Sequence, residues 1–294
     1  MPLKRLEAWI YCAFNCVVTA NYSAYPTAGY GVGNAMFEQL GRGWRICGTA
    51  LSFLAFGVGG LVLRTAVFPA LNLLIWKRTL RIMLAREVIR LTMRGFIGLM
   101  RCLGVLRYDI RGLERLNRAG LLILANHPTL IDTVFLMAFV KQANCIVKSK
   151  LWSNPFTRGP VQAAAYISNG RGDELVNDCI ASLRNGNNLI IFPEGTRTPK
   201  SGDMQFKRGA ANIAVRGSCN VTPVIIRCTP PTLGKGDKWW QVPPRWVLFT
   251  MEVREDIDIQ PIVANARSEA LGVRHLTNYL QEYFMKESER HAAA

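Results

Sequence analysis

From Tyr108 onward, short apolar runs alternate with longer segments in which apolar residues recur at helical spacing. This alternation is typical of an α/β sheet. The apolar runs predict strands over residues 108–112, 121–125, 145–148, 165–168, 189–192, 222–226 and 246–253. The longer segments predict helices over residues 129–141, 173–185, 206–216 and 264–286. We therefore expect an α/β domain over residues 108–294.

A long uncharged tract precedes this domain. Residues 46–63 carry no charge, and after Arg64 residues 65–76 are again uncharged. A membrane-spanning helix needs about 20 apolar residues, which the first run nearly supplies by itself. Two shapes fit: a single span with a kink near Pro69, or two helices that break at residues 57–60 and dip into one leaflet. A buried core helix is the alternative.

The segment that follows the tract is strongly basic. Glu87 is the only acidic residue between positions 77 and 108, and Arg86, Arg90 and Arg94 share one helical face because they recur every four residues. A basic amphipathic helix beside an apolar anchor is expected at an anionic membrane surface. The positive-inside rule then places the following domain in the cytosol.

These patterns divide the chain into three predicted parts. Residues 1–45 show no clear period and are the least informative. Residues 46–107 are predicted to form the membrane anchor with its basic amphipathic helix. Residues 108–294 are predicted to form the α/β domain.

The charge balance points to a polyanionic partner. Lys and Arg number 36 against 20 Asp and Glu, a net charge of +16. The sequence has no zinc-finger spacing, no RNA-binding aromatic signature and no low-complexity basic tail, which argues against nucleic acid. Because the basic residues gather beside the apolar tract, we expect an anionic membrane instead. The eight cysteines form no C-x-x-C pair, so we interpret them as reduced thiols and expect no metal site.

The candidate chemistry begins at Asn126-His127, which directly follows an apolar run. Pro128 fits the first position of a helix, so His127 is expected at the carboxyl end of a strand, where open α/β sheets place their sites. Asp132 lies about one helical turn further on. An imidazole with a carboxylate in reach is the arrangement of a general base. Taken alone, the pair also fits a helix-capping His and a solvated Asp.

A second motif, Phe192-Pro193-Glu194-Gly195-Thr196-Arg197, follows the apolar run 189–191. Together with Asn-His-x4-Asp at residues 126–132, it resembles the 1-acylglycerol-3-phosphate O-acyltransferase family of glycerolipid and lysophospholipid acyltransferases, which carry both motifs in this order. The resemblance covers roughly residues 105–285. It implies a mixed, largely parallel sheet flanked by helices, with an N-terminal membrane-embedded helical segment.

The resemblance also implies roles for particular residues. His127 would remove the proton from the acceptor hydroxyl, and Asp132 would orient His127. The acceptor's glycerol phosphate would bind the second motif, at Glu194, Gly195, Thr196 and Arg197. Further candidates for phosphate or oxyanion contacts are Lys148, Arg171 and Lys207. The alternatives are a structural salt bridge for Glu194 and a solvated surface charge for each of the basic residues.

The function implied is a membrane-bound acyltransferase of phospholipid biosynthesis. It would move a fatty acyl group from acyl-CoA or acyl-carrier protein to a lysophospholipid, most simply lysophosphatidic acid, with no cofactor and no metal. The enzyme would lie at the inner, cytoplasmic membrane with its catalytic domain facing the cytosol. Because no Ser or Cys beside His127 suits a nucleophile, direct transfer is expected. The alternatives are another acceptor, such as a lyso-ornithine lipid or a glycolipid, a thioesterase, and a catalytically dead lipid-binding membrane protein.

Overall fold

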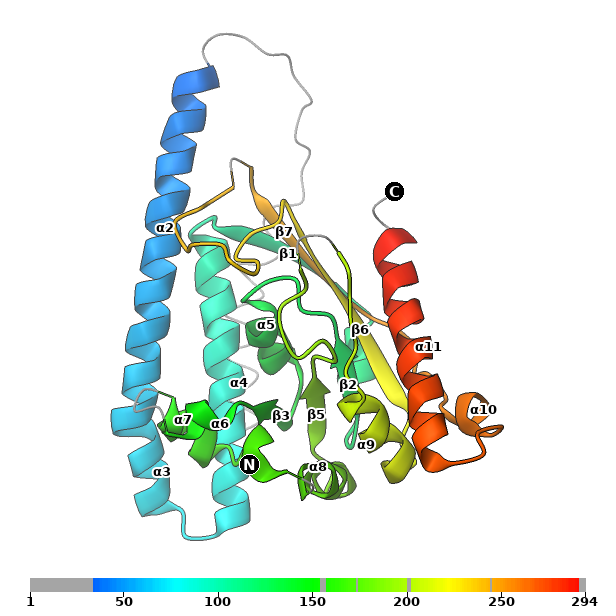
Figure 1. Cartoon of the computed structure of the whole chain (residues 1–294). Coiled ribbons are helices and arrows are strands. Elements are labelled where there is room, and N and C mark those ends of the chain that lie inside the picture. The colour runs from blue at the N-terminus through cyan, green and yellow to red at the C-terminus, as the bar shows by residue number, and fades with distance from the viewer. Residues whose placement is uncertain (1–33, 154–156, 173, 200–201, 244, 291–294) are drawn as a thin grey trace. The chain divides into compact units, whose positions relative to one another are not determined.

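The computed structural model describes residues 34–153, 157–172, 174–199, 202–243 and 245–290 (Figure 1). The chain divides into two compact units after Gln39, and the fold below is that of the second unit, Leu40–Ala294. Because the description begins at residue 34, most of the segment 1–45, for which the sequence shows no clear period, lies outside the described residues. The apolar tract and the predicted catalytic domain belong to the same compact unit.

Within the described residues, seven strands form one sheet in the order β1-β7-β6-β2-β5-β3-β4. Every neighbouring pair is parallel except β6 and β7, so the expected mixed, largely parallel sheet is confirmed. The seven strands lie close to their predicted positions: β1 Leu106–Arg111, β2 Leu122–Ala125, β3 Ala143–Val147, β4 Ile167–Ser168, β5 Asn188–Ile191, β6 Val221–Thr229 and β7 Val247–Val253.

Helices cover both faces of the sheet because its central strands are apolar on both sides. In β2, Ile123 and Ala125 join the core that includes α5, whereas Leu122 and Leu124 join the core that includes α8, α9 and α11. The four predicted helices are present as α5 Asp132–Phe139, α8 Glu174–Arg184, α9 Gly209–Gly217 and α11 Glu269–Arg290. Three shorter helices are α6 Ser149–Ser153, α7 Arg158–Ala163 and α10 Gln260–Val263.

The prediction that Pro128 opens a helix is wrong. Helix α5 begins at Asp132, and residues 126–131 form a loop between it and β2. The carboxylate of Asp132 accepts a hydrogen bond from the backbone N–H of Thr129 at 2.8 Å, which closes this loop as a turn. Such local side-chain to backbone bonds compete with helix formation.

The apolar tract forms a continuous helical stretch made of α2 Asn34–Val62, a π-helical turn Leu63–Val67 and α3 Phe68–Leu74. The proposed break at residues 57–60 is not present, and the irregular turn lies just before Pro69, which lacks a backbone donor. Within the described part of the chain, Gly41–Leu74 is the one helix long and apolar enough to cross a membrane, and its most apolar 18-residue window has a mean hydropathy of 2.0.

Helix α4, Arg78–Cys102, corrects a second prediction. The sequence predicts a membrane-facing stripe that includes Arg86 and Arg90, but both are buried in the protein. The Arg86 guanidinium donates to the carbonyl oxygen of Ala164 at 2.9 Å and to Asn187 Oδ1 at 2.6 Å. The spacing correctly places the arginines on one face, but spacing alone cannot tell whether a face meets solvent, lipid or protein.

The apolar helix packs along this domain at several points. The indole N–H of Trp44 donates to the carbonyl of Leu103 at 2.9 Å, and the Phe56 ring contacts Phe96 of α4 with centroids 5.2 Å apart. Leu63 and Phe68 are buried in the core shared with the sheet. The opposite side of the helix remains exposed and apolar, with Leu51, Leu54, Val58, Leu61 and Val62.

Candidate active site

The sheet order brings the two sequence motifs together. Strands β2 and β5 are parallel neighbours, so the loops that follow them leave from the same edge of the sheet. Asn126 fixes the end of β2, because its side-chain amide donates to the carbonyl of Ile226 at 2.8 Å and accepts from the Ile226 N–H at 2.7 Å. His127 and Glu194, 67 positions apart, thereby come into contact.

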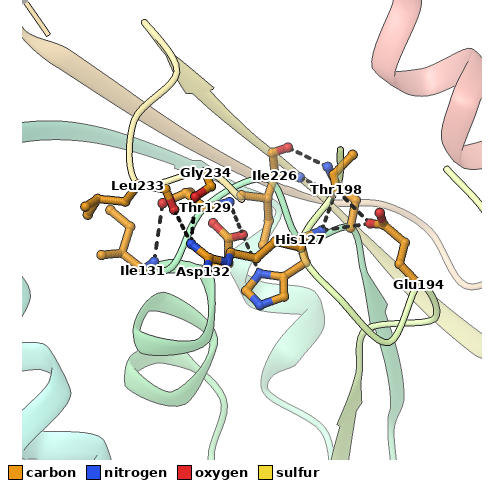
Figure 2. Close-up of polar contacts among 11 residues, drawn as sticks. His127, Thr129, Ile131, Asp132, Glu194, Thr198, Ile226, Leu233 and Gly234 are labelled. Atoms are coloured by element: carbon orange, nitrogen blue, oxygen red, sulfur yellow. Dashed lines mark hydrogen bonds and ion pairs between the residues drawn. The ribbon is translucent and has the colours of Figure 1, made fainter. Parts of the chain in front are cut away.

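His127 and Asp132 form a hydrogen-bonded pair at this edge. His127 Nδ1 lies 2.8 Å from Asp132 Oδ2 (Figure 2). The imidazole also stacks on the Phe192 ring, with centroids 4.1 Å apart. The carboxylate and the aromatic ring together fix the orientation of the imidazole. The expectation that Asp132 reaches His127 is confirmed, although the contact is made across a loop and not along a helix face.

Burial sets the electrostatics of this pair. Asp132 is fully buried, and burial raises its pKa from 3.8 to about 6 against the opposing effect of His127. The carboxylate is therefore mainly ionised at neutral pH. An ionised partner at Nδ1 favours the tautomer with the proton on Nδ1, which leaves the lone pair on Nε2 to act as a base.

Glu194 ties the second motif to the first. Its Oε1 accepts from the backbone N–H of His127 at 3.1 Å and from the Thr198 hydroxyl at 2.7 Å, and the Thr198 N–H donates to the His127 carbonyl at 2.7 Å. Burial raises the pKa of Glu194. Among the described residues it forms no ion pair, so the salt-bridge alternative finds no support there. Sequence reasoning missed Thr198, since a single threonine after a motif carries no signal of its own.

The rest of the second motif forms a turn held from two sides. Gly195 has φ +67°, a conformation that favours glycine, and the Lys207 side chain lies directly against it. Arg197 donates from one terminal nitrogen to the carbonyls of Leu233 at 2.9 Å and Gly234 at 2.7 Å. Thr196 is exposed beside them. The structure thus places Lys207 next to the second motif. That Lys207 and the motif residues contact the substrate remains a prediction.

Lys148 and Arg171 lie further along the same edge. Lys148 directly follows β3, and Arg171 lies in the 3-10 turn Asn169–Arg171 after β4. With strands about 4.8 Å apart, Lys148 follows a strand roughly 10 Å from β2 and Arg171 one roughly 14 Å away. Arg171 already pairs with Glu174 at 3.2 Å and Asp178 at 3.0 Å. Lys148 and Arg171 are both exposed, so the surface-charge alternative stays open for each of them.

A family model described as Acyltransferase matches residues 107–227, the stretch that contains both motifs. Residues 107–227 are therefore similar to the acyltransferase family. A 1-acyl-sn-glycerol-3-phosphate acyltransferase of Pseudomonas aeruginosa is 30% identical over 145 residues, covering 47% of this chain and 56% of that protein. The enzyme of the same name from Helicobacter pylori is 33% identical over 113 residues, covering 36% and 47%. The resemblance to the glycerolipid acyltransferases is thereby confirmed.

The matched part spans about half the length of these curated relatives. The fold comparison extends further. The crystal structure of the 1-acyl-sn-glycerophosphate acyltransferase PlsC from Thermotoga maritima superposes with a TM-score of 0.62 at 24% identity, covering 85% of this chain and 98% of that one. Over that part of its length, this chain therefore shares the fold of that protein.

Proposed function

We propose that this chain transfers a fatty acyl group from acyl-CoA or acyl-carrier protein to the hydroxyl of a lysophospholipid, most simply lysophosphatidic acid. The observation that supports this best is the His127–Asp132 pair, held at the carboxyl edge of the sheet inside an acyltransferase-family domain. The relatives named above are acyltransferases for 1-acyl-sn-glycerol 3-phosphate, which suggests the same acceptor here.

In the proposed reaction, His127 Nε2 takes the proton of the acceptor hydroxyl as its oxygen attacks the thioester carbonyl. The imidazolium that forms is stabilised by the Asp132 carboxylate at Nδ1. The carbonyl carbon then releases the thiol of the donor, and the proton on His127 can be returned to that leaving sulfur. The transfer is direct and uses no cofactor or metal.

The acceptor phosphate would lie over the second motif. Lys207 lies against Gly195, and Arg197 presents a planar guanidinium suited to bidentate contacts with phosphate oxygens. Lys148 would contribute further along the edge. Glu194, which bonds to the backbone of His127, would support the site without touching the substrate.

We further propose that the chain is attached to an anionic membrane through the exposed side of Gly41–Leu74, with the active site on the cytosolic side. The inner side of that helix packs along α4. Arg86 and Arg90 of α4 are buried in the protein. Drawing this helix pair through a bilayer would move these charges into hydrocarbon, which is costly. The contacts therefore favour a helix that dips into one leaflet.

An acceptor panel tests the proposed function. Purified full-length chain would be given labelled acyl-CoA and acyl-carrier protein together with lysophosphatidic acid, a lysophospholipid without a terminal phosphate, a lyso-ornithine lipid and water alone. We expect a labelled product mainly with lysophosphatidic acid. Release of free fatty acid without any acylated lipid would contradict the proposal and indicate a thioesterase.

A further inference from the structure

The loop between β6 and β7, residues 230–246, is bonded directly to the active site. We call it the β6–β7 loop. The backbone N–H of Leu130, between His127 and Asp132, donates to the carbonyl of Leu233 at 3.1 Å. Arg197 donates to the carbonyls of Leu233 and Gly234, so the two carbonyls lie beside both catalytic motifs (Figure 2). A shift of this loop would therefore disturb both motif loops.

The outer part of the same loop carries two exposed tryptophans. Trp239 is 42% exposed and Trp240 is 50% exposed, and their rings are 5.6 Å apart. The ammonium group of Lys238 lies 5.2 Å from the centre of the Trp240 ring, and Lys235 is also exposed. Exposed indoles flanked by lysines have the composition of a membrane-interface contact, because the rings favour the headgroup level and the lysines favour anionic lipid.

The tryptophan pair lies against α2, at the border of its exposed apolar side. The Trp239 ring lies 6.0 Å from the ring of Phe53. Phe53 is itself exposed, and the next residue, Leu54, belongs to the exposed apolar side. The β6–β7 loop therefore extends the surface that the apolar helix offers to a bilayer. Apolar surface of this extent is rarely left in water.

We propose that the β6–β7 loop docks Trp239 and Trp240 into the interface of an anionic phospholipid bilayer, and that Leu233, Gly234 and Arg197 couple this docking to the catalytic loop. Bound to the bilayer, the loop is held in the position that supports residues 127–132, next to the lipid acceptor. The proposed docking is argued from the exposed side chains of the loop alone. The proposed coupling rests on the acyl transfer proposed above.

Depth-dependent quenching tests the docking. Full-length chain would be bound to vesicles of phosphatidylglycerol mixed with brominated phosphatidylcholine, and the loss of tryptophan fluorescence would be compared with that of a Trp239→Phe/Trp240→Phe variant. Phenylalanine keeps the loop apolar but removes its two fluorophores. We expect the wild-type chain to lose more fluorescence than the variant. Because the other tryptophans are the same in both proteins, an equal absolute loss of fluorescence at equal concentration would overturn the docking and leave a protein partner as the occupant.

Substrate form tests the coupling. The Trp239→Ala/Trp240→Ala variant should lose about tenfold or more turnover of a long-chain lysolipid in vesicles. It should stay within about twofold of wild type on a short-chain, water-soluble acceptor, because neither tryptophan touches the catalytic pair. The matched control is Tyr279→Ala, an aromatic residue 42% exposed on α11. Equal losses on both substrates, or no loss on either, would overturn the coupling. If the wild-type chain acylates nothing, the proposed function fails and quenching alone decides the docking.

Discussion

At the residue scale, the proposed chemistry depends on how tightly His127 is held. Its ring bonds to Asp132 and stacks on Phe192, and its backbone bonds to Glu194 and Thr198. These four contacts, from the first residue of α5 and from the loop after β5, leave the imidazole little freedom, which is the preorganisation that base catalysis needs.

Asp132 should cost stability while it serves catalysis. Because burial raises its pKa to about 6, the folded state binds this proton more tightly than the unfolded state between about pH 4 and pH 6. Stability from this group therefore falls as the pH rises through that window and stays low above it. Asparagine cannot ionise, so the Tm of Asp132→Asn minus that of wild type should increase from pH 4.5 to pH 7.5, while turnover falls. A pH-independent difference would contradict this assignment.

Glu194 should act through hydrogen bonding and not through its charge. Glu194→Gln keeps an oxygen that can accept from the His127 N–H and the Thr198 hydroxyl, so it should retain most of the turnover. Glu194→Ala removes both bonds and should lower kcat by about tenfold or more, since an unpaired buried donor costs about 1–3 kcal/mol. Steady-state kinetics with both variants would decide this. An equal, large loss in Gln and Ala would instead indicate a direct role for the charge.

The motif residues of this site could be predicted because their chemistry shows in their types and order. Thr198, Leu233 and Gly234 could not, because a hydroxyl or a backbone carbonyl becomes specific only after the chain has folded around it. The hydrogen-bonding role of Glu194 could not be predicted from the sequence either. A carboxylate that accepts from a backbone N–H looks the same in the sequence as one that pairs with a base.

At the element scale, periodicity predicted the seven strands well, because short apolar runs bounded by polar residues are typical of strands buried on both faces of a sheet. Periodicity failed where a local hydrogen bond sets the start of a helix, or where a helix face could pack against either lipid or protein. The turn that Asp132 closes makes α5 begin at Asp132 and not at Pro128. The arginine face of α4 packs against the protein.

Arg86 should therefore be a structural residue of α4. Its burial lowers its pKa, and its guanidinium bonds the carbonyl of Ala164 and the side chain of Asn187. Arg86→Met should lower the free energy of unfolding by about 1–3 kcal/mol by leaving these groups unpaired. Arg78→Met, at the exposed start of the same helix, is the matched control and should change it by less than about 0.5 kcal/mol. Urea titrations in detergent would measure both. A membrane-facing Arg86 would give equal values.

At the scale of the whole molecule, the apolar helix has two different sides. Its inner side contributes Leu63 and Phe68 to the core, and its outer side exposes Leu54 at 62% and Leu61 at 54%. Composition predicted the helix, but only the packing shows that it belongs to the same compact unit as the catalytic domain.

The outer side should determine membrane attachment. The full-length chain should stay on anionic vesicles in high salt and require detergent for release. Leu54→Glu/Leu61→Glu should shift it to the supernatant, since each charge costs roughly 2–4 kcal/mol of insertion free energy. Tyr279→Glu on α11 is the control and should remain bound. Sedimentation across a salt series measures this, and a wild-type chain released by salt alone would rule out the apolar anchor.

The proposed mechanism depends above all on His127 as the general base, and one comparison tests this role most directly. Turnover of labelled acyl-CoA with a short-chain acceptor would be measured for His127→Ala and for His275→Ala, which removes an exposed histidine on α11. We expect a loss of about 10²-fold or more for His127→Ala, with its circular dichroism and vesicle binding unchanged. His275→Ala should keep wild-type turnover. A folded His127→Ala protein with near-normal turnover would contradict the mechanism.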